Sequence, residues 1–315
     1  MTPLKRLIPW TLVALAGLAA AGLAGAKTKL DAESEKFYKT GRLIMTKEEN
    51  KIFQRLPDAA ARKEFIADFW LKRDPDPDTP ANEFRQEFEA RVDFVNKRFK
   101  EGGPGYNTDR GRVYIFLGQP DKVEEFSPEP GATVRGFVIW WSYYDHKLAI
   151  EFADEKNEGR YRISNYEGDM FEAMDLIKLG QSIRTDDVFN KKSVKFETRY
   201  DPDSREIEVR LPSKALMFRE NETGGLQVDL RFLIYIYGDG GATKESFADA
   251  RSVVTTVAEE DSQKTVSFRF ARTLKPGTNF VDVIIQGKEG LKGKIRQIFE
   301  IKVAGERQRE KGPRP

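Results

Sequence analysis

Cysteine is absent from the 315-residue sequence, and histidine occurs only once. The missing cysteine excludes a disulfide framework, a thiol nucleophile and a cysteine-ligated zinc site. The single histidine, His146, lies in a predicted turn between Asp145 and Lys147, and no serine-elbow motif accompanies it. A histidine-based catalytic mechanism is therefore disfavoured.

An excess of charge of one sign is also missing. The formal net charge is +2, and Lys5 and Arg6 are the only charged residues among the first 26. Without that segment the chain carries 51 basic and 51 acidic residues. Nucleic-acid-binding proteins usually carry a strong basic excess, so we expect no nucleic-acid partner. No complete motif for a cofactor or a metal ion is present, and we expect neither.

The first feature that is present is an apolar run over residues 7–23, preceded by a short basic start. Ala24-Gly25-Ala26 then places small residues where a signal peptidase cuts. This pattern predicts a secretory signal peptide cleaved before Lys27, with an uncleaved N-terminal anchor as the alternative. No second long apolar run follows, so we expect a periplasmic or secreted protein without a membrane span after cleavage.

Residues 31–100 are predicted to be helical. Thr46–Glu49 has the spacing of a capping box, and Asp58 is placed to cap the next helix. Thr79-Pro80 predicts a further helix start, because threonine caps helices well and proline fits the first helical position. The apolar positions of that helix recur at helical spacing until the glycines and proline at 102–104.

The hydrophobic period changes after residue 105. β-Branched and aromatic residues predict strands over Arg112–Leu117, Val138–Tyr144, Leu148–Phe152 and Arg160–Ile163. A short helix is predicted over Phe171–Leu179. Helices followed by strands predict an α+β N-terminal domain, with helices packed on a small antiparallel sheet.

The C-terminal half alternates in the β manner from Ser193 onward. About seven short strands separated by turns predict an all-β immunoglobulin-like sandwich. The predicted strands are Lys195–Tyr200, Glu206–Leu211, Leu226–Tyr237, Arg251–Thr256, Lys264–Arg272, Phe280–Gln286 and Gln297–Val303.

These patterns predict a division of the chain into five parts. Residues 1–26 form the signal peptide and 27–180 the α+β domain. Residues 181–192 are a polar linker, 193–304 the β-sandwich, and 305–315 a charged, disordered tail.

The most distinctive stretch is Gly105-Tyr106-Asn107-Thr108-Asp109, which continues as Arg110–Asp121. It resembles the motif of the GWxTD-domain family of bacterial exported proteins, with tyrosine in place of tryptophan at Tyr106. The segments Phe69–Pro75 and Ile139–Tyr144 also resemble the family pattern, so the resemblance covers roughly residues 40–170. The family has no assigned activity, and the resemblance implies architecture rather than a reaction.

The motif supplies the candidate binding residues, which are Tyr106, Thr108, Asp109, Arg110 and Arg112. In a structural interpretation they build a rigid helix-to-strand connector. Gly105 then adopts a conformation closed to other residues, and Thr108 and Asp109 bond backbone amides. In a functional interpretation they line a polar pocket in which Asp109 and Arg112 contact a ligand.

Two functions from different classes follow. We expect an exported, non-enzymatic binding or scaffold protein that contacts another envelope or secreted protein. The alternative is a carboxylate-dependent hydrolase acting on an envelope polysaccharide or peptide, with Asp109 as its base. A cleft in which Asp109 meets a second acid would favour the hydrolase, whereas bonds from Asp109 to backbone amides would favour the scaffold.

Overall fold

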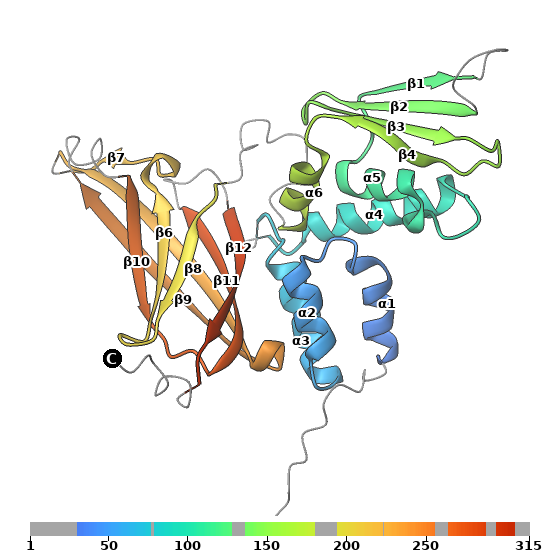
Figure 1. Cartoon of the computed structure of the whole chain (residues 1–315). Helices are drawn as coiled ribbons and strands as arrows, with labels where there is room; N and C mark the ends of the chain where they lie inside the picture. Colours follow the sequence, from blue (N-terminus) through green and yellow to red (C-terminus); the bar gives the residue numbers. More distant parts are fainter. Residues whose placement is uncertain are drawn as a thin grey trace, which may run out of the picture.

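A computed structural model describes residues 30–76, 79–127, 136–179, 194–222, 224–255, 264–287 and 294–305. Figure 1 shows a helical N-terminal part, a small sheet above it, and a β-rich C-terminal part beside it. The predicted signal peptide, the linker at 181–192 and nearly all of the predicted tail lie outside the described residues. No helix in the described ranges is long and apolar enough to span a membrane.

Four helices open the fold: α1 (Ala32–Gly41), α2 (Lys47–Arg55), α3 (Ala59–Leu71) and α4 (Glu83–Arg98). The predicted capping box at Thr46 and the Asp58 cap are both confirmed. The predicted start at Thr79-Pro80 is wrong, because α4 begins at Glu83. Asn82 caps it instead, since its side chain accepts a hydrogen bond from Arg85 N at 2.8 Å.

The strand predicted over Arg112–Leu117 is a helix, α5 (Asp109–Leu117). A short apolar run fits a buried strand or a buried helix equally well, and the caps decide between them. The side chain of Thr108 caps the start, and Gly118 (φ 78°) ends the helix in a conformation that favours glycine. The motif therefore connects two helices rather than a helix to a strand.

A four-stranded antiparallel sheet follows, in the order β1 (Lys122–Phe126), β2 (Phe137–Tyr143), β3 (Leu148–Asp154) and β4 (Arg162–Glu167). The last three strands were predicted; the polar edge strand β1 was not. Helix α6 (Met170–Lys178) confirms the predicted short helix. One face of the sheet packs on α4, α5 and α6 (Figure 1) and contributes Trp141, Ile150 and Phe152 to the core.

The C-terminal half forms two antiparallel sheets. One has the order β10 (Thr265–Ala271), β6 (Glu206–Pro212) and β5 (Glu197–Asp201). In the other, β11 (Gly277–Gly287) lies between β12 (Lys294–Val303) and β8 (Leu226–Gly238), and β8 also pairs with β7 (Arg219–Glu220) and β9 (Thr243–Thr255). Strand β9 begins eight residues before its prediction, because its first half is mostly polar and has no fully buried side chain, so it lacks the apolar alternation on which the prediction relied.

The residues that the structure describes form two apolar cores. One lies between the two C-terminal sheets. The other fills the helical half and extends to side chains on the outer face of the five-stranded sheet, including Tyr235, Tyr237, Phe280 and Ile284. The halves therefore share a packed interface.

Candidate functional site

The centre of the motif is a helix cap. Thr108 is buried, and its Oγ1 accepts a hydrogen bond from Gly111 N at 2.9 Å while donating one to Gly105 O at 2.8 Å. Through the Thr108 hydroxyl, the two bonds together connect the short helix η1 (Gly105–Asn107) to the first turn of α5. Thr108 is therefore committed to the backbone on both sides.

The two motif glycines permit close packing. A Cβ atom at Gly105 would lie 1.9 Å from Val95 O in α4, and one at Gly111 would lie 1.9 Å from Gly105 O. Neither residue has a positive φ. The expectation that Gly105 adopts a conformation closed to other residues is therefore wrong. Gly105 is needed because its backbone packs directly against the backbone of α4.

Asp109 of the motif and the nearby Glu101 accept hydrogen bonds from backbone amides at the start of strand β4. Asp109 Oδ2 accepts a hydrogen bond from Ile163 N at 3.1 Å, and Glu101 Oε2 accepts one from Tyr161 N at 3.0 Å. These amides are two residues apart, so they point to the same edge of the strand. Arg162 adds an ion pair to Asp109 at 3.6 Å. The carboxylates thus stand where a neighbouring strand would otherwise pair.

The remaining candidates have different environments. Arg110 forms an ion pair with Glu101 at 2.6 Å and stacks on the ring of Tyr161, 4.0 Å from its centroid. Tyr106 is half-buried against the core, whereas Arg112 is exposed. The structure brings Asp109 and Arg110 to β4 and leaves Arg112 outside that contact.

A pocket at the β3–β4 hairpin adjoins this joint and is lined by Arg162, Asp154 and Arg160 among others. Asp154 is 3% exposed, and its two carboxylate oxygens accept hydrogen bonds from Glu158 N and Gly159 N. That acid is therefore engaged in the hairpin turn. No group of three or more metal-ligating side chains occurs within the described residues.

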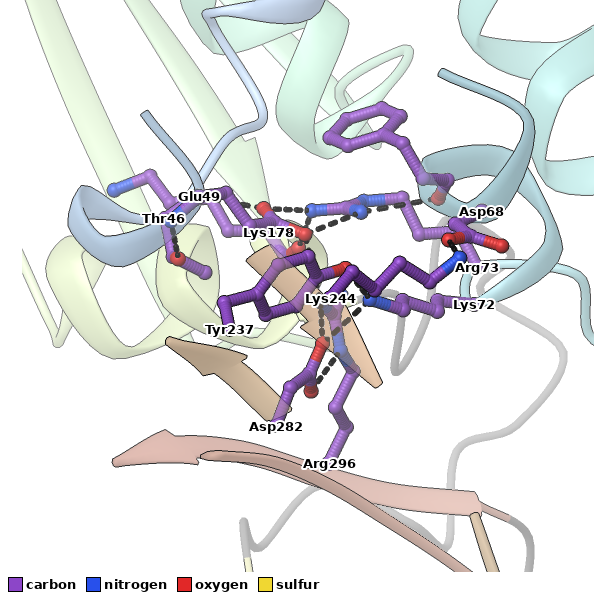
Figure 2. Close-up of polar contacts among 11 residues, drawn as sticks. Thr46, Glu49, Asp68, Lys72, Arg73, Lys178, Tyr237, Lys244, Asp282 and Arg296 are labelled. Carbon is purple, nitrogen blue, oxygen red and sulfur yellow. Dashed lines mark hydrogen bonds and ion pairs between the residues drawn. The ribbon is translucent and has the colours of Figure 1, made fainter. Parts of the chain in front are cut away.

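A second polar site, which the sequence did not reveal, lies between the two halves (Figure 2). Glu49 of α2 is 3% exposed and meets Arg73 at 2.9 and 2.6 Å through both carboxylate oxygens. Arg73 also donates to the carbonyl oxygens of Ile44, Phe69 and Lys178. The guanidinium thereby ties four segments of the helical half together.

Arg296 of β12 extends this cluster into the β half. It donates to Glu49 at 2.7 Å and to both oxygens of Asp282 at 2.9 and 2.8 Å. Lys72 Nζ also lies 2.9 Å from Asp282 Oδ2 and donates to Tyr237 Oη at 2.7 Å. We call Glu49, Lys72, Arg73, Asp282 and Arg296 the buried network.

The buried network holds three basic groups and two carboxylates. Burial would raise the pKa of Glu49, but the positive charges of Arg73 and Arg296 outweigh it and lower that pKa to about 2. Burial lowers the pKa of Lys72, whose Nζ lies 3.7 Å from the ring centroid of Tyr235. The negative face of that ring offsets the excess positive charge.

Three further contacts join the halves around this network. Lys244 of β9 bonds Asp68 and Glu64 of α3, and Lys51 of α2 meets Glu300 of β12 at 2.7 Å. The Lys294 amine donates to Asp74 O at 2.7 Å, and burial lowers its pKa to about 8.

Glu49 was predicted only as the last residue of a capping box, a role that it does fill by accepting from Thr46 N at 2.9 Å. Its partner Arg296, and Asp282, which Arg296 also binds, lie in alternating strands where charged residues are ordinarily interpreted as solvent-facing. No local pattern signals a pairing 247 positions apart.

A family model described as the GWxTD domain matches residues 31–173. This range runs from the cap of α1 into α6, and it includes the motif and three members of the buried network. No curated protein and no solved structure matches the chain.

Proposed function

Because this chain belongs to the GWxTD-domain family, we propose that it is an exported, non-enzymatic scaffold protein that acts through protein contacts at the bacterial envelope. The proposal rests on the observation that the motif residues contact other parts of the same chain. Thr108, Asp109 and Arg110 are engaged with the chain's own backbone and side chains. The motif residues act as a joint between helix α5 and strand β4.

The rest of the architecture supports a scaffold role. The buried network and the ion pairs around it join the GWxTD domain to the β half through Lys72–Asp282 and Arg296–Glu49. The β half is an immunoglobulin-like sandwich in this proposal, supported by two antiparallel sheets around one core. Such modules commonly space or bind other domains.

Export follows from residues 1–26, whose basic start, apolar run and Ala24-Gly25-Ala26 end support signal cleavage before Lys27. The full chain, produced with a C-terminal tag in a bacterial host, tests this. We expect a periplasmic protein whose N-terminal residue is Lys27 by mass spectrometry. A cytoplasmic, uncleaved chain would contradict export.

Chemical crosslinking in cells that naturally contain the protein tests the scaffold role. We expect one envelope protein captured in fixed ratio, and capture that is unchanged by Asp109→Asn. The hydrolase would be favoured instead if purified protein cleaved an envelope polysaccharide or peptide and the Asp109→Asn variant, still folded, did not.

A further inference from the structure

The outer face of the four-stranded sheet carries a row of three side chains suited to binding a cation, Glu124, Trp140 and Glu151. The inner face packs on α4, α5 and α6, and no other described helix or strand lies on the outer face (Figure 1). Trp141 points inward and is 5% exposed. Successive side chains of a strand alternate between faces, so Trp140 lies on the outer face, where it is half-buried.

The register places a carboxylate on each side of Trp140. Glu124 of β1 and Glu151 of β3 are both paired with it across the strands. Directly opposed residues have Cβ atoms roughly 5 Å apart, so one aromatic ring lies between two acids. Ser164 Oγ donates to Glu151 Oε1 at 2.6 Å, which fixes this carboxylate. Lys122 Nζ lies 2.9 Å from Glu124 Oε1 in an exposed ion pair that a bound cationic head has to displace, and exposed pairs of this kind contribute little to stability.

The charge of the surrounding sheet has the same sign as this row. Residues 121–127 and 136–167 contain nine carboxylates and five lysines and arginines, a net charge of −4. The chain beyond residue 26 is neutral overall, so the acidic excess is a local property. A negative patch attracts positively charged partners and repels acidic ones.

We propose that the outer face of this sheet binds a lysine- or arginine-bearing segment of a partner protein, with one cationic head stacked on Trp140 between Glu124 and Glu151. Arginine fits best, because its planar guanidinium stacks on an aromatic ring while donating to carboxylates at its edge. This inference rests on the proposed function, since it names the chemistry of one of the scaffold's protein contacts.

The test uses the full mature chain and a fluorescein-labelled hexa-arginine peptide, with binding followed by anisotropy at low and high salt. We expect saturable binding that weakens with salt, because exposed charges are screened. Trp140→Leu and Glu151→Gln should each weaken it about fivefold or more. Two matched control variants should leave the affinity for the peptide unchanged. Tyr144→Leu removes an exposed aromatic ring outside the row, and Glu125→Gln removes an acid on the opposite face of the sheet.

Several results would overturn the inference. They are no binding, equal binding of a glycine–serine hexapeptide, an equal loss in the control variants, or self-association of the chain that Trp140→Leu abolishes. If Trp140→Leu does not fold, the comparison of peptide binding by Glu151→Gln and by Glu125→Gln still tests the inference. If the peptide does not bind but crosslinking captures an envelope partner, only this inference is refuted. If the peptide binds but the chain is not exported, only the proposed function is refuted.

Discussion

Replacing Glu49 by glutamine removes one negative charge from the buried network without changing its shape. The wild-type network has three basic groups against two carboxylates, so the variant leaves three against one. Breaking a buried ion pair by removing one partner costs about 3–5 kcal/mol, because the remaining charge has no compensation. We expect a loss of that size in the free energy of unfolding, measured by urea denaturation with circular dichroism.

The same charge count predicts a rescue. Adding Arg296→Met to Glu49→Gln restores the original excess of one basic group, so the double variant should regain roughly 1–2 kcal/mol over Glu49→Gln alone. The matched control is Glu89→Gln, which loses an exposed pair with Arg85 and should cost less than about 1 kcal/mol. A Glu49→Gln protein as stable as the control, or a double variant less stable than the single, would refute the reasoning.

Three further predictions concern the motif and the interface. Thr108→Val removes a helix cap and should lower the free energy of unfolding by about 1–2 kcal/mol in urea titrations, with Thr108→Ser recovering most of it. Gly105→Ala places a Cβ atom 1.9 Å from a backbone oxygen and should lower the melting temperature far more than Gly103→Ala, where nothing lies within 4 Å. Folding lowers the pKa of Lys294 from 10.5 to about 8, so the unfolded chain binds more protons between these values and stability should rise with pH there. Lys294→Met should flatten this slope in unfolding titrations from pH 8 to 10.5, and an unchanged slope would contradict the assignment.

Elements with a local signal were predictable from the sequence. The capping box at Thr46, the Asp58 cap and strands β2 and β3 depend on residues close together in the chain. Helix α5 was not predictable in the same way, because Val113–Leu117 is a short apolar run rich in β-formers. Its helical state depends on caps and on the packing of Gly111 against Gly105.

The same distinction between local and long-range contacts applies to the candidate site. The residues of the motif could be selected from the sequence, but the partners of Asp109 and Arg110 could not, since Ile163 lies 54 positions away and Glu101 belongs to the preceding loop. The buried network depends on contacts across more than two hundred residues. Such contacts are set by tertiary packing, which no local periodicity encodes.

The hydrogen bond from Ile163 N to Asp109 is the contact through which the motif holds strand β4, and amide hydrogen exchange at Ile163 tests it directly. In Asp109→Ala we expect exchange at this amide to become about tenfold faster or more, as loss of a charge-assisted hydrogen bond implies. Tyr161, held by Glu101, serves as the internal reference and should change less. Unchanged protection at Ile163 together with an unchanged melting temperature would contradict the role of the motif as a structural joint.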